Sequence, residues 1–313
     1  MKTAIIVGSG GQDGRLLTEL LRPEGYRILG IGRSSVTTTG LEWPGPVDIT
    51  RPADVAAVVE AFKPDEIYHL AAIHHSSQES QADDLEAFRR LYEVNFFSLL
   101  HFLEAVRVAS RRSRLFFAAS SHVFGKPATD IQDETTPLRP DSVYGMTKAD
   151  GLLACRQYRD RHGLFASTGI LYTHESPHRD EKFLAMKIVR AALRIRAGRQ
   201  RELVLGSLDA TIDWGWAPDY VEAMRGIVAA GEAGEFVVAT GAPHTVRDFL
   251  RVAFEIVGLD WRRHVREDAG IITRETPIRV GNPAKLRAAT GWEPRVGFED
   301  MIRALVSAHG AET

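Results

Sequence analysis

The sequence is poor in cysteine, in unbalanced charge and in long apolar runs, and each absence excludes a class of protein. The only cysteine, Cys155, can form neither an intrachain disulfide nor a cysteine-based zinc site. The formal net charge of −2 provides no basic surface for a polyanion, so we expect no nucleic-acid partner. No run could cross a bilayer and no secretory leader is recognisable, so we expect no membrane partner and a cytoplasmic location.

The residues that are present describe an ordinary globular chain. Of its 313 residues, 44% are apolar and 26% are charged, enough for one large domain, alone or with a smaller lobe. Cys155 falls in an amphipathic stretch, residues 151–163, that is typical of a helix packed on a core. We therefore predict that its thiol is a buried packing group.

A glycine-rich turn follows the first apolar run of the chain. Residues 3–7 read as a strand, and the spacing Gly8-x-x-Gly11-x-x-Gly14 leads from it into a helical pattern. Glycines let the backbone approach a pyrophosphate, and the free N–H groups of a helix N-terminus bind the phosphates. This order of elements predicts a dinucleotide-binding βα unit.

The end of the second predicted strand, residues 26–32, indicates which dinucleotide binds. An NAD enzyme usually has an acidic residue there for the ribose 2′-hydroxyl, whereas an arginine accommodates a 2′-phosphate. Here the strand is followed by Arg33 and Ser34. We therefore predict NADP as the cofactor, with Arg33 and then Ser34 as its phosphate contacts.

Two later segments are expected to contact the same cofactor. Asp48 and Ile49 are predicted to close a third short strand, at the point where such folds contact adenine. A fourth predicted strand, residues 66–70, runs into Ala71 and Ala72, whose small side chains let the backbone lie against the cofactor.

The next segment, residues 73–77, is polar and contains the pair His74 and His75. It lies at the carboxyl end of a predicted parallel strand, where α/β folds place their ligands. Paired histidines suggest a metal site, but no third ligand is near them in sequence. We expect a loop or a substrate wall here, with no metal.

A long helix is predicted over residues 84–108, with Asn95 inside its apolar stripe. A polar amide in that position is more often a structural hydrogen-bonding group than a catalyst. The loop between His122 and Tyr144 contains three prolines, so we expect no long regular element there and place it at the mouth of the site.

The strongest chemical signal is Ser120, at the end of a predicted strand over residues 115–119, followed by Tyr144-x-x-x-Lys148. One helical turn sets the lysine beside the phenol. A phenol with an ordinary pKa of about 10 acts as an acid or base near neutral pH only if a nearby positive charge favours phenolate. This spacing is the catalytic layout of a short-chain dehydrogenase/reductase.

The alternation of strands and helices predicts an α/β fold, a Rossmann-type doubly wound parallel sheet with a smaller C-terminal substrate-binding lobe. We expect residues 1–180 to form the NADP-binding domain, with 209–241 returning to it. After residue 180 the alternation gives way to irregular segments, and 181–208 and 242–313 are predicted to form the lobe.

Several longer strings make the resemblance specific: GSGGQDG at 8–14, TTPLRPDSVYGMTKAD at 135–150, GILYTHESPHR at 169–179, LGSLDATIDWGWAPDYVEAM at 205–224 and FVVATGAPHTVRDF at 236–249. On these strings the chain resembles, over nearly its full length, the extended short-chain dehydrogenase/reductases and, within them, the GDP-mannose 4,6-dehydratases. That family oxidises a nucleotide sugar at C4, eliminates water across C5–C6 and returns the hydride to C6.

The resemblance implies a set of site residues. The NADP contacts would be Gly8, Gly11, Gln12, Asp13, Gly14, Arg33, Ser34, Asp48, Ile49, Leu70, Ala71, Ala72, Tyr144, Lys148, His174 and Arg179. The catalytic set would be Ser120, His122, Tyr144 and Lys148. The candidates for substrate contacts are His75, Ser121, Thr173, Lys187 and Arg274.

Three positions depart from the family pattern. His122 stands where the family has the glutamate that removes the C5 proton, and a neutral imidazole can also act as a base. Thr173 stands in place of an asparagine. Ile212 stands in place of an arginine, which removes an expected partner of the substrate diphosphate, although Lys187, Arg190, Arg274 or Arg279 could compensate.

Three functions therefore stay open. The leading hypothesis is an NADP-dependent 4,6-dehydratase of a GDP-hexose, with His122 as the base. The first alternative is an NADP-dependent nucleotide-sugar 4-ketoreductase or 4-epimerase, which needs only Ser120, Tyr144 and Lys148. The second is a non-catalytic NADP-binding protein. By resemblance, we expect a homodimer or homotetramer.

Overall fold

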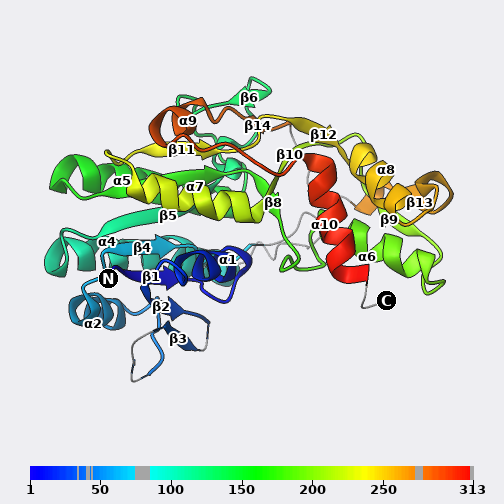
Figure 1. Ribbon diagram of the computed structural model, residues 1–313. Coiled ribbons are helices and arrows are strands. Elements are labelled where there is room, and N and C mark those ends of the chain that lie inside the picture. The colour runs from blue at the N-terminus through cyan, green and yellow to red at the C-terminus, as the bar shows by residue number, and fades with distance from the viewer. Residues whose placement is uncertain (34, 40–42, 44, 75–84, 272–277, 311–313) are drawn as a thin grey trace.

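A seven-stranded sheet organises the N-terminal two-thirds of the chain, in the strand order β11-β7-β5-β4-β1-β2-β3 (Figure 1). The computed structural model describes residues 1–310 except 34, 40–42, 44, 75–84 and 272–277. The strands of this sheet are β1 (Thr3–Val7), β2 (Arg27–Ile31), β3 (Val36–Thr39), β4 (Glu66–His69), β5 (Arg114–Ser120), β7 (Ala166–Leu171) and β11 (Glu235–Val238). The predicted α/β class is confirmed.

All neighbouring strands pair in parallel except β3, which runs antiparallel to β2 at the sheet edge. The prediction that Asp48 and Ile49 close the third strand is wrong. Both residues lie outside any strand, because the Asp48 carboxylate accepts hydrogen bonds from the Thr50 N–H (2.9 Å) and hydroxyl (2.7 Å) and closes a local turn. Val36–Thr39 takes the edge position instead.

Helices cover both faces of the sheet, as its apolar strands require. One face packs against α1 (Gln12–Leu21), α7 (Ala217–Ala229) and α9 (Ala284–Thr290). The other packs against α2 (Pro52–Phe62), α4 (Ser98–Ala109) and α5 (Val143–His162). Cys155 of α5 is fully buried in this second layer, which confirms the packing thiol.

The predicted long helix is present but is not uniformly α-helical. It consists of α3 (Leu85–Tyr92), one π-helical turn η1 (Glu93–Phe97) and α4; Asp84, the predicted first residue, lies outside the described residues. The π turn holds the fully buried Asn95, whose amide accepts from the Ile73 N–H (2.7 Å) and donates to the Ile73 carbonyl (3.0 Å). The structural role predicted for Asn95 is confirmed.

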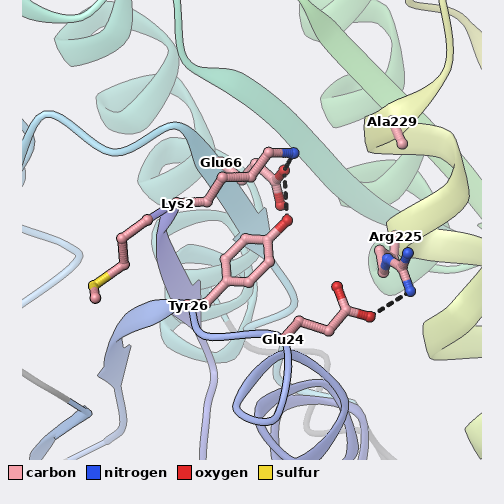
Figure 2. Close-up of a pocket in the computed structure, with 7 residues that line it drawn as sticks. Lys2, Glu24, Tyr26, Glu66, Arg225 and Ala229 are labelled. Atoms are coloured by element: carbon pink, nitrogen blue, oxygen red, sulfur yellow. Dashed lines mark hydrogen bonds and ion pairs between the residues drawn. The ribbon is translucent and has the colours of Figure 1, made fainter.

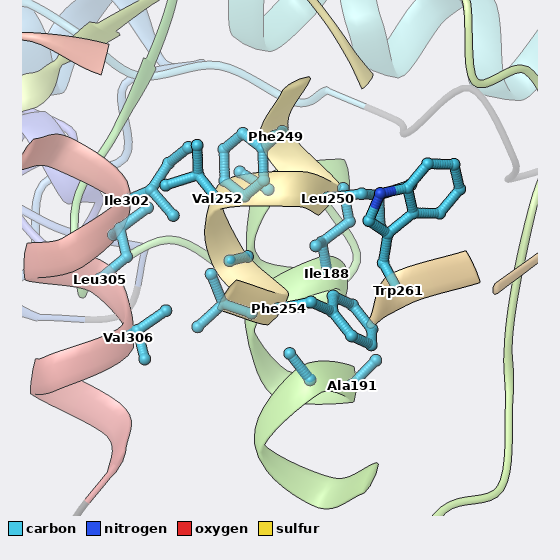
Figure 3. Packing of buried hydrophobic residues seen from close by; sticks show 14 of the residues in the cluster. Ile188, Ala191, Phe249, Leu250, Val252, Phe254, Trp261, Ile302, Leu305 and Val306 are labelled. Carbon is cyan, nitrogen blue, oxygen red and sulfur yellow. The ribbon is translucent and has the colours of Figure 1, made fainter. Parts of the chain in front are cut away.

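A second core lies in the C-terminal lobe, at the right of Figure 1. Its helices are α6 (Leu184–Arg196), α8 (Val246–Ile256) and α10 (Phe298–Gly310), with the short strands β9 (Leu203–Leu205) and β13 (Val265–Glu267) paired in parallel. Figure 3 shows side chains from all three helices pointing into a common apolar centre, among them Ile188, Phe254 and Leu305. The lobe thus has a hydrophobic core of its own.

Short strands connect the two parts of the molecule. A three-stranded sheet contains β8 (Thr173–Glu175), β10 (Thr211–Trp216) and β12 (Pro243–Thr245), and a two-stranded one contains β6 (Ile131–Gln132) and β14 (Val280–Gly281). The lobe boundary 242–313 needs one correction. Leu286 of α9 and Trp292 pack into the core on the α1/α7 face of the large sheet, because the chain returns there before α10.

Candidate active site

The catalytic candidates meet at the carboxyl edge of the large sheet. Ser120 ends β5, and its Oγ accepts the His122 N–H (3.3 Å), which starts the 3-10 helix η2 (Ser121–Phe124). The Ser142 hydroxyl caps α5 by accepting the Gly145 N–H (3.2 Å). That cap places Tyr144 and Lys148 one turn apart at the start of the helix, beside the end of β5.

Tyr144 is half-buried, and burial raises the pKa of its phenol to about 12. A hydrogen bond with Ser120 and the positive charge of Arg179 act in the opposite direction and favour phenolate, whereas the charge of Asp13 opposes it. The hydroxyl and cation needed to tune this phenol are therefore both close to it.

Lys148 is 1% exposed, and its Nζ donates to the Ala118 carbonyl (2.7 Å). It lies 5.8 Å from the centroid of the Tyr144 ring. Burial lowers the pKa of Lys148 to about 7, with Asp13 acting against this shift. The lysine beside the phenol was predicted; the structure adds that Arg179 is the cation whose charge opposes the rise in the pKa of Tyr144.

Two imidazole rings contact the Tyr144 side chain, and a phenylalanine ring packs on one of them. The His74 ring lies 4.4 Å from the Tyr144 ring and the His122 ring lies 5.6 Å from it, both edge to face. The two imidazoles are 5.8 Å apart, and Phe183 stacks on His74 at 5.6 Å. We call His74, His122, Tyr144 and Phe183 the aromatic cluster. It brings two potential proton carriers to the catalytic phenol.

A buried ion pair joins the first helix to the segment after β7. His174 Nε2 lies 3.1 Å from Asp13 Oδ1, and its Nδ1 lies 2.7 Å from the Tyr172 carbonyl oxygen. Burial opposes the charge on His174, but the Asp13 carboxylate outweighs it and the pKa of His174 is raised. The pKa of Asp13 is lowered, because His174 and Arg179 outweigh the effect of its burial.

Gln12 strengthens the same junction. Its side chain donates to the His174 carbonyl (3.2 Å) and accepts the Ser176 hydroxyl (2.9 Å). Arg179 follows, with its guanidinium 3.7 Å from the Phe183 ring centroid and its Nε 3.5 Å from the Glu175 carboxylate. Burial raises the pKa of Glu175, with Arg179 opposing the shift. The predicted residues Gln12, His174 and Arg179 thus form one polar network.

The glycine turn suits a close approach to a dinucleotide phosphate, because it leaves no space for a side chain at Gly8 or Gly14. A Cβ on Gly14 would meet the Gly8 carbonyl oxygen at 2.3 Å, and Gly8 itself has φ +93° and would meet the Ala71 nitrogen at 2.8 Å. The turn opens directly onto the N-terminus of α1, whose N-cap Gly11 brings no capping side chain. Backbone N–H groups therefore remain for an anion.

We expect Gly14→Ala to destabilise the fold by about 1–3 kcal/mol, because its methyl group overpacks against rigid backbone, and to weaken NADPH binding. Gly10→Ala is the matched control, since a Cβ there meets nothing within 4 Å. Urea unfolding and fluorescence titration with NADPH measure both effects. Equal stability and affinity in the two variants would show that the turn does not need this close packing.

Other predicted residues lie apart from the aromatic cluster or outside the described residues. Arg33 is exposed just beyond β2, and Asp48 is exposed in its turn. Thr173 starts β8, Ser121 is buried in η2, and Lys187 is half-buried in α6, where burial lowers its pKa. The predicted contacts Ser34, His75 and Arg274 lie outside the described residues. Leu70 to Ala72 continue from β4 beside the glycine turn; the Leu70 N–H donates to the Val7 carbonyl (2.9 Å).

Two residues of the site were not among the predicted site residues. His74 belongs to the segment expected to form a substrate wall, but the substrate contact predicted in that segment is its neighbour His75. Phe183 follows the HESP string and reads in sequence as an ordinary helix-flanking aromatic. Both residues are far from Tyr144 in the sequence, so no local spacing links them to it. The only sequence signal for them is that they follow predicted strands.

A surface depression of about 400 Å³ lies on the opposite edge of the sheet (Figure 2). Its lining includes Lys2, Tyr26 and Glu66, which stand at the amino ends of β1, β2 and β4. The Glu66 carboxylate accepts hydrogen bonds from Lys2 Nζ (2.9 Å), Tyr26 OH (3.1 Å) and Tyr68 OH (2.8 Å), so these polar groups bond to one another. The depression lies at the amino ends of the strands and is not part of the catalytic edge.

Two further properties hold for the described part of the chain. No group of three His, Cys, Asp or Glu side chains there is arranged to hold a metal ion. None of the helices there is long and apolar enough to cross a membrane.

A Rossmann-type sheet with a serine, a tyrosine and a lysine at its carboxyl edge defines an enzyme of the extended short-chain dehydrogenase/reductase class. The model of one family in this class, GDP-mannose 4,6 dehydratase, matches residues 5–305. The chain belongs to the GDP-mannose 4,6-dehydratase family.

Named relatives agree with the family match. GDP-mannose 4,6 dehydratase 1 of Arabidopsis thaliana is 37% identical, over 97% of this chain and 89% of its own length. GDP-mannose 4,6-dehydratase of Sinorhizobium fredii (strain HH103) is 33% identical, over 97% of this chain and 95% of its own length. The resemblance stated from the sequence is thus confirmed across the whole chain.

Solved structures share the fold at lower identity. RMD from Pseudomonas aeruginosa complexed with NADPH has a TM-score of 0.84 at 21% identity, with complete coverage of both chains. A dTDP-glucose 4,6-dehydratase from Bacillus anthracis in complex with NAD has the same TM-score at 16% identity, covering 99% of this chain and 97% of its own. These two solved structures each contain a nicotinamide dinucleotide, NADPH in the first and NAD in the second.

Proposed function

We propose that this enzyme is an NADP-dependent nucleotide-sugar 4,6-dehydratase that acts on GDP-mannose or a closely related GDP-hexose. The single observation that carries the proposal is the meeting of Ser120, Tyr144 and Lys148 with His122 at one sheet edge, in a chain of this family. Oxidation at C4 and removal of the C5 proton both need groups at that edge.

The chain's own residues divide the proton transfers. Tyr144 takes the C4 hydroxyl proton, with Ser120 hydrogen-bonded to the phenol and to the sugar oxygen. The bound nicotinamide supplies hydride acceptance at C4 and hydride return at C6. Oxidation makes the C5 proton acidic, because the carbanion is conjugated with the new ketone. His122, as a neutral imidazole, takes that proton in place of the family's glutamate.

The loss of the family arginine at Ile212 has a candidate replacement. Arg279 pairs with Ile212 as an isolated parallel bridge, and its guanidinium donates to the Gly125 carbonyl (3.4 Å). Because the two residues are paired, the guanidinium of Arg279 can contact a substrate at the place where an arginine at position 212 would contact it. We assign Arg279 to the substrate diphosphate, since a planar fork of donors suits phosphate oxygens.

The preference for NADP rests on Arg33, which is exposed beyond the end of β2, where a dinucleotide ribose lies in this fold. We expect Arg33→Ala to raise the Kd of NADPH about 10- to 100-fold, the loss of a charged hydrogen bond, and to leave that of NADH unchanged. Arg27→Ala, at the exposed amino end of the same strand, is the control. Calorimetric titration with both dinucleotides measures the difference, and a parallel loss of affinity for NADH would contradict the assignment.

A homo-oligomer is supported by exposed apolar side chains on neighbouring helices. Phe88 of α3 and Phe97 of η1 are 38% and 46% exposed, and Met146 and Leu153 of α5 are 38% and 46% exposed. Helix α5 packs beside both α3 and η1. A patch of this kind fits burial against a second copy of the chain.

The alternative reaction is a nucleotide-sugar 4-ketoreduction or 4-epimerisation. It is favoured by one feature, the replacement of the glutamate base by His122, because neither reaction removes the C5 proton. Stoichiometry separates a ketoreductase, which consumes one NADPH per sugar, from a dehydratase or an epimerase, which recycles the dinucleotide. Of these two, only the dehydratase removes the C6 hydroxyl.

A further inference from the structure

His74 holds the central place in the aromatic cluster. Its ring contacts the catalytic phenol more closely than His122 does, with ring centroids at 4.4 Å against 5.6 Å. It also faces His122 at 5.8 Å and stacks on Phe183. His74, His122 and Tyr144 thus form a triangle of neighbouring rings, which includes the phenol proposed to take the C4 proton and the imidazole proposed as the C5 base.

The backbone at His74 is held from two sides. Both backbone groups of the preceding residue, Ile73, bond to the Asn95 amide, and Asn95 also donates to the Thr147 hydroxyl (3.3 Å), next to Lys148. The His74 carbonyl accepts from Lys182 Nζ (3.3 Å). A buried amide inside a π-helical turn therefore connects this segment to the catalytic helix, and such turns often occur at functional sites.

The dehydratase reaction poses a proton problem that the family motif does not solve in this chain. Water leaves C6 only if the departing oxygen receives a proton. If His122 supplied it, His122 would give up the proton taken from C5 and could not protonate C5 later in the cycle. Tyr144 meanwhile carries the proton from the C4 hydroxyl.

We propose that His74 is the proton donor to the departing C6 oxygen and is itself reprotonated by Tyr144. The inference rests on the proposed dehydratase function. A neutral imidazole has one N–H that donates and one nitrogen that accepts, so it can pass a proton on while taking another and avoid the imidazolium form. The ring centroids of His74 and Tyr144 lie 4.4 Å apart, so the imidazole is an immediate neighbour of the phenol with which it would exchange a proton.

The atoms and electrons balance with the bound dinucleotide alone, which would accept the hydride from C4 and give it back at C6. The C4 hydroxyl proton goes to Tyr144. The C5–H bond breaks toward His122 as the C6–O bond breaks, and His74 protonates the oxygen, which leaves as water, while Tyr144 reprotonates His74. His122 exchanges its proton with solvent and then protonates C5, which gives the 4-keto-6-deoxy sugar and restores all three side chains.

The test uses His74→Ala with GDP-mannose in deuterated buffer, in a single turnover with stoichiometric NADP. We expect the absorbance of the reduced nicotinamide to rise as in the unsubstituted enzyme and then to persist, because water loss slows about 10²- to 10⁴-fold. Deuterium should still enter C5 of the unreacted 4-keto sugar, since His122 remains. Added imidazole should restore water loss, which a purely structural role would not explain.

His264→Ala is the matched control, because it removes an imidazole stacked on a phenylalanine ring, Phe254, in the lobe, outside the aromatic cluster. We expect it to retain water loss. A His74→Ala variant that forms the 4-keto-6-deoxy product at the unsubstituted rate overturns the inference and leaves the proposed function intact. If the unsubstituted enzyme oxidises no GDP-hexose, the proposed function fails and the inference fails with it.

If the His74→Ala variant does not fold, a measurement on the free protein tests the same proposal. Proton NMR of the unsubstituted chain and of Tyr144→Phe follows the titration of the His74 ring. We expect removal of the phenol hydroxyl to shift the His74 titration midpoint and to change its ring signals more than those of His244, which lies on the lobe side of the molecule against Phe298. Unchanged His74 signals would show that the two groups are not coupled and would overturn the relay.

Discussion

Replacing His122 with alanine is expected to stop the dehydratase reaction after C4 oxidation, with kcat lower by about 10²- to 10⁴-fold. The imidazole is the group proposed to take the C5 proton, and its ring lies 5.6 Å from the Tyr144 ring. Without it, the sugar is oxidised but the C5–H bond stays intact. In deuterated buffer the trapped 4-keto sugar should therefore contain no deuterium at C5, unlike the corresponding product of His74→Ala.

His122→Glu is the informative control for this substitution. A carboxylate at this position is what the family resemblance implies, so the variant should recover most of the activity that alanine loses. His122→Gln, which keeps a polar side chain of similar size and cannot take a proton, should behave like alanine. Normal turnover in His122→Ala would show that another group is the base and would contradict the assignment.

The second large effect is expected for Tyr144→Phe, which should lower the rate of C4 oxidation by about 10²- to 10⁴-fold. Removing the hydroxyl removes the group that takes the C4 proton, while the ring keeps its packing against His74 and His122. Stability and NADPH affinity should change little. Rapid-mixing absorbance of the reduced nicotinamide measures the step directly.

The matched control for the phenol is Tyr92→Phe. Tyr92 also donates to an acceptor, Asp150 (2.9 Å), on helix α5, but it lies outside the aromatic cluster. Its hydroxyl can be removed without touching the site, so oxidation should proceed as before. If the two variants oxidise the sugar equally well, Tyr144 is not the group that takes the proton.

Much of the site could be predicted because its signals are local. Ser120, Tyr144 and Lys148 are placed by one strand end and one helical turn, and the glycine turn by the first βα junction, so spacing along the chain reports spacing in the fold. The buried Cys155 and the structural Asn95 followed in the same way, from a helical period and from the rule that a buried amide finds partners.

The predictions are wrong where a side-chain hydrogen bond or a long-range contact determines the local structure. The turn at Asp48 depends on a carboxylate that bonds Thr50, and this replaced the expected strand. The packing of Leu286 and Trp292 on the large sheet depends on where the chain returns after the lobe. The closeness of His74 to Tyr144 depends on the segment after β4 and the start of α5, which only the folded sheet brings together.

The groups that affect the pKa of the Tyr144 phenol could also be predicted only in part. One helical turn correctly places Lys148 beside Tyr144, but sequence spacing cannot report that the ammonium is buried or that its pKa is lowered to about 7. Arg179 supplies a charge that favours the phenolate, from a segment 35 residues further along the chain. Desolvation depends on everything packed around a group, and no local pattern contains that information.

The central claim is that water leaves the sugar and that the hydride taken from C4 returns to C6. One incubation tests this claim most directly. GDP-mannose is supplied in deuterated buffer with a trace of NADP, and the product is analysed by mass spectrometry and NMR. The account predicts a 4-keto-6-deoxy sugar with one deuterium at C5 and no net change in NADPH. A sugar that retains its C6 hydroxyl, or that forms only with stoichiometric consumption of NADPH, would contradict it.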